Sequence, residues 1–202
     1  MTAVRQRLGM FGGAFDPPHN THVALILAAI DQLELDEMRV FPTGDAWHKP
    51  RQLTSAVHRV AMAELAFSSI PRVVVDDRET YRTGPSYTVD TLRELKRDRP
   101  EADLFLIIGG DQARALDTWH EWQVIPQLAI ICVAEREDST WASSVFTPPD
   151  ALKSRFLRLE MPPSAISASD IRARIATHKS VVPLVCEPVA RYIDHHHLYQ
   201  TV

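Results

Sequence analysis

Cysteine is scarce in this chain of 202 residues, and positive charge is not in excess. The two cysteines, Cys132 and Cys186, lie in apolar stretches and lack metal-like spacing, which predicts reduced core residues in a cytoplasmic protein. The formal net charge of -4 excludes a global positive field that would attract nucleic acid or an anionic membrane. Any anionic ligand must therefore be bound by a local group of cations and backbone amides.

Long apolar runs are also missing. No run is long enough to cross a bilayer, and the start of the chain, MTAVRQRLGM, lacks the apolar stretch of a signal peptide. We therefore expect neither a membrane nor a nucleic acid as a partner, and we expect a cytoplasmic location. No repeat, low-complexity tract or linker interrupts the sequence, so we expect one domain over residues 1–202.

Short apolar segments alternate with longer amphipathic ones. The apolar segments predict strands at residues 8–11, 38–41, 72–75, 104–108, 129–134 and 156–161. We expect helices at 21–33, 55–68, 86–97, 148–153, 169–177 and 188–196. The apolar face of the helix at 55–68 is expected to consist of Val57, Val60, Ala61 and Leu65. The polar stretch 135–147 is expected to be a mobile loop. This alternation predicts an α/β fold, a Rossmann-like doubly wound parallel sheet with helices on both faces.

The stretch GGAFDPPHNTH, residues 12–22, lies between the first strand and the first helix. It is therefore at the carboxyl edge of the sheet, where open parallel sheets bind ligands. Gly12 and Gly13 allow a close ligand approach, and the helix start offers free N–H groups and a positive dipole end. His19 and His22 share one face of the first turn. These features favour a polyphosphate cradle over a tight turn with capping histidines, and no third ligand suggests zinc.

A second anion site is indicated by ISASDIRARI, residues 166–175. Ser169 is the expected N-cap of the helix there, and Arg172 follows one turn later. The hydroxyls of Ser167 and Ser169, free backbone amides and a guanidinium group would together bind phosphate. Taken alone, the stretch is more typical of a plain capped helix.

Two stretches follow further predicted strands. PTGDAWHKP, residues 42–50, brings His48 and Lys49 to the end of the second strand, although its composition fits an exposed loop equally well. GPSYTVDTL, residues 84–92, begins a helix with Ser86 as its expected N-cap.

A third stretch, IIGGDQARALDTWHEW, spans residues 107–122. It places Gly109, Gly110 and Asp111 at the end of the fourth strand, and Trp119 follows eight residues after Asp111. Taken alone, a single tryptophan such as Trp119 is more often part of the core.

Taken in their order along the chain, these stretches resemble the motifs of the nucleotidyltransferase superfamily. GGAFDPPHNTH is similar to its G-x-F-D-P…H-x-G-H signature, and ISASDIRARI to its I-S-x-[ST]-x-I-R element. The other three resemble elements of bacterial nicotinate-nucleotide adenylyltransferases. Thr21 stands where the signature has glycine, and Arg136 alone matches the family's R-P-G element. The resemblance covers nearly the whole chain and implies the nucleotidyltransferase fold, with a C-terminal helical part (about 165–202) that closes a triphosphate site.

The resemblance implies ATP and nicotinate mononucleotide as substrates, with deamido-NAD and pyrophosphate as products. The catalytic residues that it implies are His19, His22 and Arg172. Those implied to bind ATP are Gly12, Gly13, Phe15, His19, His22, Gly109, Ser167, Ser169 and Arg172. Those implied to bind the mononucleotide are His48, Lys49, Tyr87, Thr88, Asp111 and Trp119. Mg²⁺ is expected as the cofactor, held mainly by ATP and water, with no protein metal site.

Two alternatives stay open at this point. A phosphopantetheine adenylyltransferase would share the first and last motifs, but it gives no reason for the PSYT and TWHEW elements. A non-catalytic relative that only binds an adenine nucleotide is favoured by Thr21, which could crowd the nucleotide. The sequence leaves the oligomeric state open, a homodimer included, and it does not decide how strictly nicotinate is preferred over nicotinamide.

Overall fold

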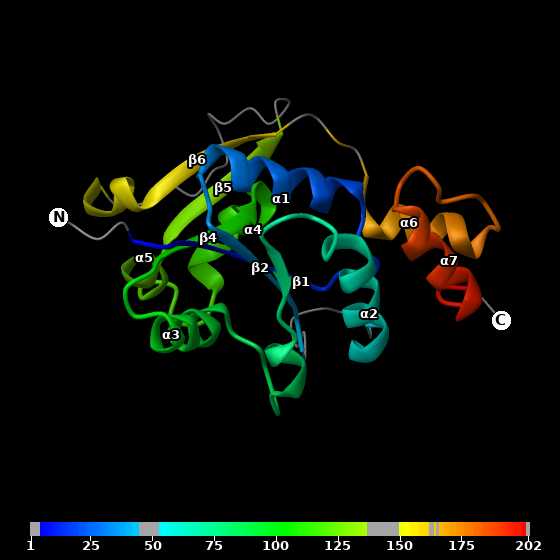
Figure 1. Ribbon diagram of the computed structural model, residues 1–202, viewed down its shortest axis with the longest axis horizontal. Coiled ribbons are helices and arrows are strands. Elements are labelled where there is room, and N and C mark those ends of the chain that lie inside the picture. Colours follow the sequence, from blue (N-terminus) through cyan, green and yellow to red (C-terminus); the bar gives the residue numbers. More distant parts are fainter. Residues whose placement is uncertain (1–4, 45–52, 137–149, 162–163, 165, 201–202) are drawn as a thin grey trace.

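The computed structural model describes residues 5–44, 53–136, 150–161, 164 and 166–200. Six strands form one sheet in the order β3-β2-β1-β4-β5-β6, and all neighbours are parallel (Figure 1). The strands are β1 (Arg7–Gly13), β2 (Glu37–Pro42), β3 (Val73–Val75), β4 (Asp103–Gly109), β5 (Ile130–Arg136) and β6 (Phe156–Met161). The helices are α1 (Asn20–Gln32), α2 (Ala56–Phe67), α3 (Thr88–Asp98), α4 (Gly110–Arg114), α5 (Ile125–Leu128), α6 (Ala168–Ala176) and α7 (Glu187–His195).

The winding of the sheet reverses between β1 and β4. The chain runs outward from β1 to β3, then returns to β4 and continues to the opposite edge. Doubly wound sheets bind ligands at this switch point, outside the carboxyl ends of the strands. β1 ends at Gly13 and β4 ends at Gly109. The two glycine pairs of the sequence therefore lie at the switch point.

Alternate residues of the central strands enter two separate cores. In β4, Leu104, Leu106 and Ile108 belong to one core, and Phe105 and Ile107 belong to the other. Helices α3, α4 and α5 cover the first core, and α1, α2, α6 and α7 cover the second; Figure 1 shows α1 and α3 on opposite sides of the sheet. A sheet buried on both faces needs apolar strands throughout. The predicted fold class is confirmed.

Several predicted boundaries need correction. The helix expected from residue 86 begins at Thr88, and the segment expected as a helix at 148–153 is a short 3-10 helix over Asp150–Arg155. The stretch 135–147, expected to be mobile, belongs to β5 as far as Arg136 and otherwise lies outside the described residues. The short helices α4 and α5 were not predicted, because so few residues show no helical period. Within the described part of the chain, no helix is long and apolar enough to cross a membrane.

The buried face of α2 differs from the predicted one. Val57 is 76% exposed and Leu65 is 40% exposed. The helix has apolar side chains on more than one side, so its period alone did not identify the face that packs on the sheet. The residues that it buries are Arg59, Met62, Ala63, Ala66 and Phe67.

Candidate functional site

Residues 12–22 comprise the end of β1, the turn that follows and the start of α1; this segment, called the turn below, contacts a neighbouring strand end at the switch point. The carbonyl of Gly13 accepts a hydrogen bond from the N–H of Thr43 at 2.9 Å, which joins the ends of β1 and β2. Beyond its chain neighbours, a Cβ atom added at Gly12 or Gly109 would meet no atom of the described residues within 4 Å. A ligand can therefore approach the backbone closely at both positions.

The two predicted catalytic histidines form a stacked pair at the start of α1. Their ring centroids are 3.7 Å apart, and the rings are inclined by 23°. His19 is the N-cap residue, and its backbone N–H donates to Nδ1 of His22 at 3.1 Å. Because Nδ1 accepts this bond, the proton of a neutral His22 ring is on Nε2. His22 can therefore offer an N–H donor to an anionic ligand.

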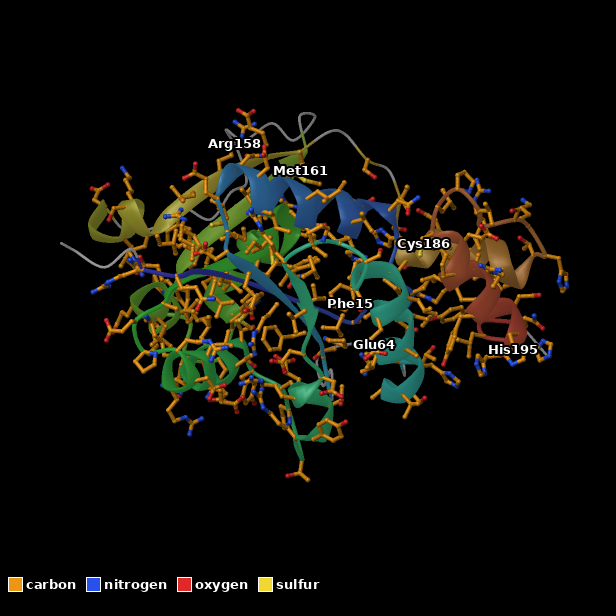
Figure 2. The ribbon with its side chains drawn as sticks, in the orientation of Figure 1. Phe15, Glu64, Arg158, Met161, Cys186 and His195 are labelled. Atoms are coloured by element: carbon orange, nitrogen blue, oxygen red, sulfur yellow. The ribbon has the colours of Figure 1, made fainter. Side chains whose placement is uncertain are left out.

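Phe15 packs against the ring of His22. Its φ of +47° lies in the left-handed region, and it is 2% exposed. Its ring meets His22 edge to face at 5.2 Å and Phe67 at 5.4 Å, and Figure 2 shows Phe15 deep in the molecule beside α2. A Cβ atom at Gly13 would lie 2.9 Å from this ring, so a side chain there would displace the ring of Phe15. The contact between Phe15 and ATP stays a prediction, whereas the support of His22 is observed.

Helix α6 brings Arg172 to the same turn. Its Nη1 donates to the carbonyl oxygen of Asp16 at 2.8 Å, and its Nη2 donates to Oγ of Ser169 at 3.1 Å. The N-cap is Ser167 rather than Ser169, since Oγ of Ser167 accepts from the N–H of Asp170 at 3.1 Å. Both serines suit an N-cap, so the sequence did not distinguish them. The hydroxyl of Ser169 instead holds Arg172.

The residues between the two histidines also join the turn to the C-terminal part of the chain. Asn20 donates from Nδ2 to the carbonyl of Pro183 at 2.6 Å, and from its backbone N–H to the carbonyl of Leu184 at 2.9 Å. Oγ1 of Thr21 lies 2.5 Å from Oγ of Ser164. The residue that replaces the signature glycine therefore bonds the segment that leads into α6.

A buried arginine that the sequence analysis missed holds the turn from inside. Arg59 is 2% exposed and donates to the carbonyls of Thr54, Ala14 and Gly44 at 2.9, 3.0 and 3.3 Å. Burial lowers the pKa of Arg59, and the negative charge of Asp16 acts in the opposite direction. Arg59 precedes Met62, Ala63 and Ala66 by three, four and seven residues and so shares their helical face. The sequence pattern favoured a different face of this helix for the core.

The carboxylate of Asp16, also 2% exposed, is the second buried charge. It accepts from the hydroxyl of Tyr199 at 2.6 Å and from the N–H of Thr54 at 3.3 Å. Burial raises the pKa of Tyr199, and the adjacent Asp16 charge raises it further, so the hydroxyl is protonated and donates. No sequence pattern indicated this bond, because the two residues are 183 positions apart.

Residues of the predicted mononucleotide site gather at the start of α3. Tyr87 is the N-cap residue, and its ring stacks on His120 with 4.2 Å between centroids. This contact brings the segment that contains Trp119 to the N-terminus of α3. The N-cap prediction for Ser86 is wrong, because the hydroxyl of Ser86 donates instead to the carbonyl of Glu79 at 3.4 Å.

Of the remaining residues predicted to bind the mononucleotide, the structure describes some and not others. Thr88 opens α3, and Asp111 lies in the first turn of α4, where it forms an ion pair with Arg114. His48 and Lys49 lie outside the described residues, so their roles stay predictions.

Packing connects the end of β2 to this region. A Cβ atom at Gly44 would collide with the carbonyl oxygen of Glu79 and would lie 2.9 Å from Oγ of Ser86. Since the end of β2 also bonds Gly13 through Thr43, contacts run without interruption from the histidine turn to α3.

Ion pairs support the segment that precedes α3. Nη2 of Arg78 lies 2.8 Å from Asp76, and its Nη1 lies 2.9 Å from Asp98. Burial alone would raise the pKa of Asp76, but the bonds from Arg78 and Arg39 together lower it below its usual value. Asp76 is therefore charged at neutral pH and stabilises the fold in that form.

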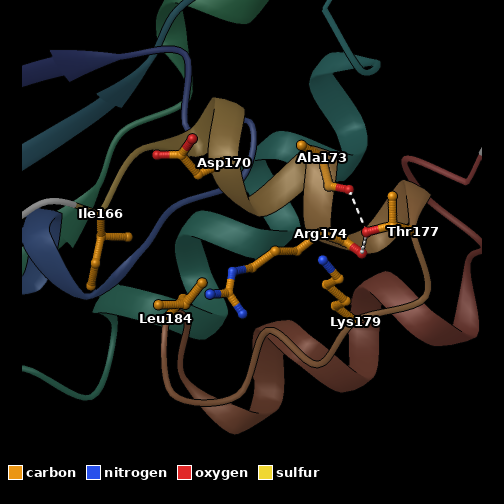
Figure 3. Close-up of a pocket in the computed structure, with 7 residues that line it drawn as sticks. All are labelled: Ile166, Asp170, Ala173, Arg174, Thr177, Lys179 and Leu184. Carbon is orange, nitrogen blue, oxygen red and sulfur yellow. Dashed lines mark hydrogen bonds between the residues drawn. The ribbon is translucent and has the colours of Figure 1, made fainter.

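A cavity of about 550 Å³ lies along another face of α6 (Figure 3). Arg174 extends across it toward Leu184, whereas Arg172, two positions earlier, bonds Asp16. The cavity is lined by Ile166, Asp170, Ala173, Arg174, Thr177, Lys179 and Leu184. None of these residues is a predicted site residue. The convergence of polar groups, rather than the size of a cavity, marks the candidate site.

Within residues 5–44, 53–136, 150–161, 164 and 166–200, no group of three or more His, Cys, Asp or Glu side chains could hold a metal ion. Asp16, the carboxylate of the turn, is buried and already bonded by Tyr199 and Thr54. The groups that the turn offers to a ligand are imidazoles, a guanidinium and backbone N–H groups, which suit phosphate oxygens.

Comparisons with known proteins identify the family and the fold. The family model described as cytidylyltransferase-like matches residues 10–174. A probable nicotinate-nucleotide adenylyltransferase of Albidiferax ferrireducens is 63% identical over 97% of this chain and 99% of its own length. One from Methylibium petroleiphilum is 43% identical over 96% and 93%. Among solved structures, the Plasmodium falciparum nicotinic acid mononucleotide adenylyltransferase complexed with APC has the same fold, with a TM-score of 0.73 at 18% identity over 96% and 98%.

Proposed function

Because the chain belongs to the cytidylyltransferase-like family and, within it, to the nicotinate-nucleotide adenylyltransferases, we propose that it transfers the adenylyl group of ATP to nicotinate mononucleotide. The products are deamido-NAD and pyrophosphate, and the reaction is a step of NAD biosynthesis. The observation that carries the proposal is the meeting of His19, His22 and Arg172 at one turn of the switch point.

The reaction needs alignment and charge stabilisation rather than a general base. The phosphate of the mononucleotide is already an anionic nucleophile. It attacks the α-phosphorus of ATP in line, a new P–O bond forms, and the bond to the bridging oxygen of pyrophosphate breaks. No covalent enzyme intermediate is required.

The contacts support the roles that we assign at the phosphate end. His22 has Nε2–H available as a donor and His19 stacks on it, so we assign both rings to stabilising charge on the α- and β-phosphates. Arg172, held by Asp16 and Ser169, binds the departing pyrophosphate. Other ATP contacts are assigned to Gly12, Gly13, Phe15, Gly109, Ser167 and Ser169.

At the other end, the pyridine ring stacks on Trp119, and backbone amides at Tyr87 and Thr88 receive its carboxylate. Both amides lie at the N-terminus of α3, where the helix dipole favours an anion. His48 and Lys49 place the attacking phosphate, and Asp111 completes the pocket.

Magnesium fits this arrangement as a partner of ATP. The turn offers donors rather than free carboxylates, so Mg²⁺ would be held by phosphate oxygens and water. When bound, it neutralises phosphate charge.

Both cysteines are free thiols, which suits a reducing compartment, and we place the protein in the cytoplasm. The C-terminal part, about residues 165–202, closes the triphosphate site through Arg172.

The test is pyrophosphate release from ATP and Mg²⁺ with three acceptors in parallel: nicotinate mononucleotide, nicotinamide mononucleotide and phosphopantetheine. We expect nicotinate mononucleotide to give pyrophosphate and deamido-NAD in equal amounts. Release with phosphopantetheine alone would identify the other enzyme. ATP binding without pyrophosphate from any acceptor would identify a non-catalytic relative.

A further inference from the structure

The end of the chain turns back toward the phosphate site. After α7, the N–H of Leu198 donates to the carbonyl of Ile193 at 3.0 Å, and both His197 and Tyr199 have positive φ, at 51° and 63°. Leu198 and Tyr199 pack against the core that α1, α2, α6 and α7 cover. The hydroxyl of Tyr199 is directed inward and lies 4.0 Å from Sδ of the buried Met62.

Two hydrogen bonds through one residue connect this tyrosine to the catalytic arginine. The hydroxyl of Tyr199 donates to Oδ1 of Asp16 at 2.6 Å, and the backbone carbonyl of Asp16 accepts from Nη1 of Arg172 at 2.8 Å. The side chain of Asp16 thus bonds the C-terminal segment, and its backbone carbonyl bonds α6. Both acceptor groups belong to one residue that is packed at 2% exposure, so the bond from Tyr199 helps to fix the position of the residue whose carbonyl holds Arg172.

We propose that Tyr199 is a positioning residue of the adenylyl transfer, which fixes Asp16 and thereby sets the guanidinium of Arg172 against the β- and γ-phosphates of ATP. This inference rests on the proposed function. Tyr199 does not touch substrate. Through Asp16, it restricts the movement of the Arg172 guanidinium. Fixed charges are more effective in catalysis than charges that must reorganise.

Removal of the hydroxyl should therefore affect ATP more than the mononucleotide. In Tyr199→Phe, the buried carboxylate of Asp16 loses a close donor and reorients or draws in water. We expect kcat to fall about 10-fold and the KM for ATP to rise about 3-fold, as for the loss of one charge-assisted hydrogen bond. The KM for nicotinate mononucleotide should stay within about 2-fold, since the described residues that are predicted to bind it lie from the N-cap of α3 onward in the sequence.

A matched control is available on the same part of the chain. Tyr192 of α7 also bonds through its hydroxyl, which lies 3.0 Å from Nδ1 of His58, and neither residue belongs to the site. Tyr192→Phe removes the same atom, a tyrosine hydroxyl oxygen. Because Tyr192 lies outside the site, this change should leave kcat and both KM values unchanged. Thermal unfolding of both variants shows whether they are folded. If Tyr199→Phe unfolds more than about 10 °C below the wild type, Asp16→Asn is tested in its place, because it weakens the same bond. The same kinetic criteria then apply to Asp16→Asn.

A double-mutant comparison distinguishes positioning from general support. In an Arg172→Ala background, a further Tyr199→Phe change should alter kcat by less than about 2-fold, because the group that it positions is gone. An undiminished loss in that background, equal shifts of both KM values, or kinetics like those of Tyr192→Phe would each overturn the inference while the proposed function stands. If the wild type gives no pyrophosphate, the proposed function fails, and calorimetric titration with ATP alone decides the inference: a weaker Kd for Tyr199→Phe but not for Tyr192→Phe supports it, and equal Kd values contradict it.

Discussion

The phosphate end and the mononucleotide end of the candidate site are held by different kinds of contact. At the phosphate end, Arg59 and Asp16 are both 2% exposed, and they hold the turn through several backbone groups. At the mononucleotide end, the stacked rings of Tyr87 and His120 accompany an ion pair between Arg93 and Glu121 whose side chains are 43% and 40% exposed.

This difference matches what each end has to do. Charge that develops during phosphoryl transfer is stabilised best by groups that are fixed beforehand, so buried contacts suit the histidine turn. An aromatic ring can be recognised by stacking on a surface that moves slightly. Substitutions at the phosphate end should therefore lower turnover or folding stability, whereas those at the other end should change mononucleotide affinity.

The largest effect is expected at His22. We expect His22→Ala to lower kcat by about 10² to 10³, with little change in the KM for the mononucleotide, because it removes a fixed donor to the phosphates. Steady-state kinetics with both substrates varied measures this split. His22→Gln is the matched control, since its side-chain amide can still donate near the position of Nε2, and it should recover part of the activity. Near-normal turnover of His22→Ala would remove this residue from the catalytic set.

Arg59→Met should give the largest loss of folding stability. Three backbone carbonyls lose their donor, and the buried charge of Asp16 loses a nearby cation. We expect the free energy of unfolding to fall by about 3 kcal/mol or more, measured by urea denaturation. Arg93→Met, at an exposed ion pair of the other end, should leave it nearly unchanged. Equal losses for the two variants would remove the contrast between the ends.

Trp119→Ala tests the mononucleotide end. Loss of the stacking surface should raise the KM for nicotinate mononucleotide roughly 10-fold, while the KM for ATP stays nearly constant. Trp119→Phe retains an aromatic face, so its KM for nicotinate mononucleotide should lie between those of the wild type and Trp119→Ala. Equal increases in both KM values would count against the stacking assignment.

The smallest effect is expected at Asp76, whose folded-state pKa lies below the usual 3.8. Such a group stabilises the fold above its unfolded pKa, and this contribution is lost as pH falls through the lower, folded value. Asp76→Asn should therefore cost about 1 kcal/mol at pH 7 and progressively less below about pH 4. Urea denaturation across this range checks the trend, and a cost independent of pH would contradict it.

The parts of the fold that follow from local pattern were predictable. The apolar run at 104–108 identified β4 because a strand buried on both faces has no polar side, and the histidine turn was found because its residues are contiguous. The N-cap at Ser169 was misassigned because Ser167 suits that position equally well. Ser86 was misassigned because its hydroxyl bonds the carbonyl of Glu79 instead of capping α3. Which of several suitable residues is used depends on tertiary contacts.

The support of the site could not be predicted for a different reason. Arg59 lies in a helix with apolar residues on more than one side, so its burial became clear only once the packed face was known. The bond between Tyr199 and Asp16 joins residues 183 positions apart. Nothing in the sequence near either residue indicates such a partner, because chain topology alone brings them together.

The most direct test of the account compares ATP binding to Arg172→Ala and Arg174→Ala. Both arginines belong to α6, but one bonds the histidine turn and the other lines the separate cavity. Calorimetric titration should show ATP affinity reduced about 10-fold or more for Arg172→Ala, as expected when a charge-assisted phosphate contact is lost, and unchanged for Arg174→Ala. The opposite result would place the triphosphate in the cavity and contradict the convergence of His19, His22 and Arg172 on one ligand.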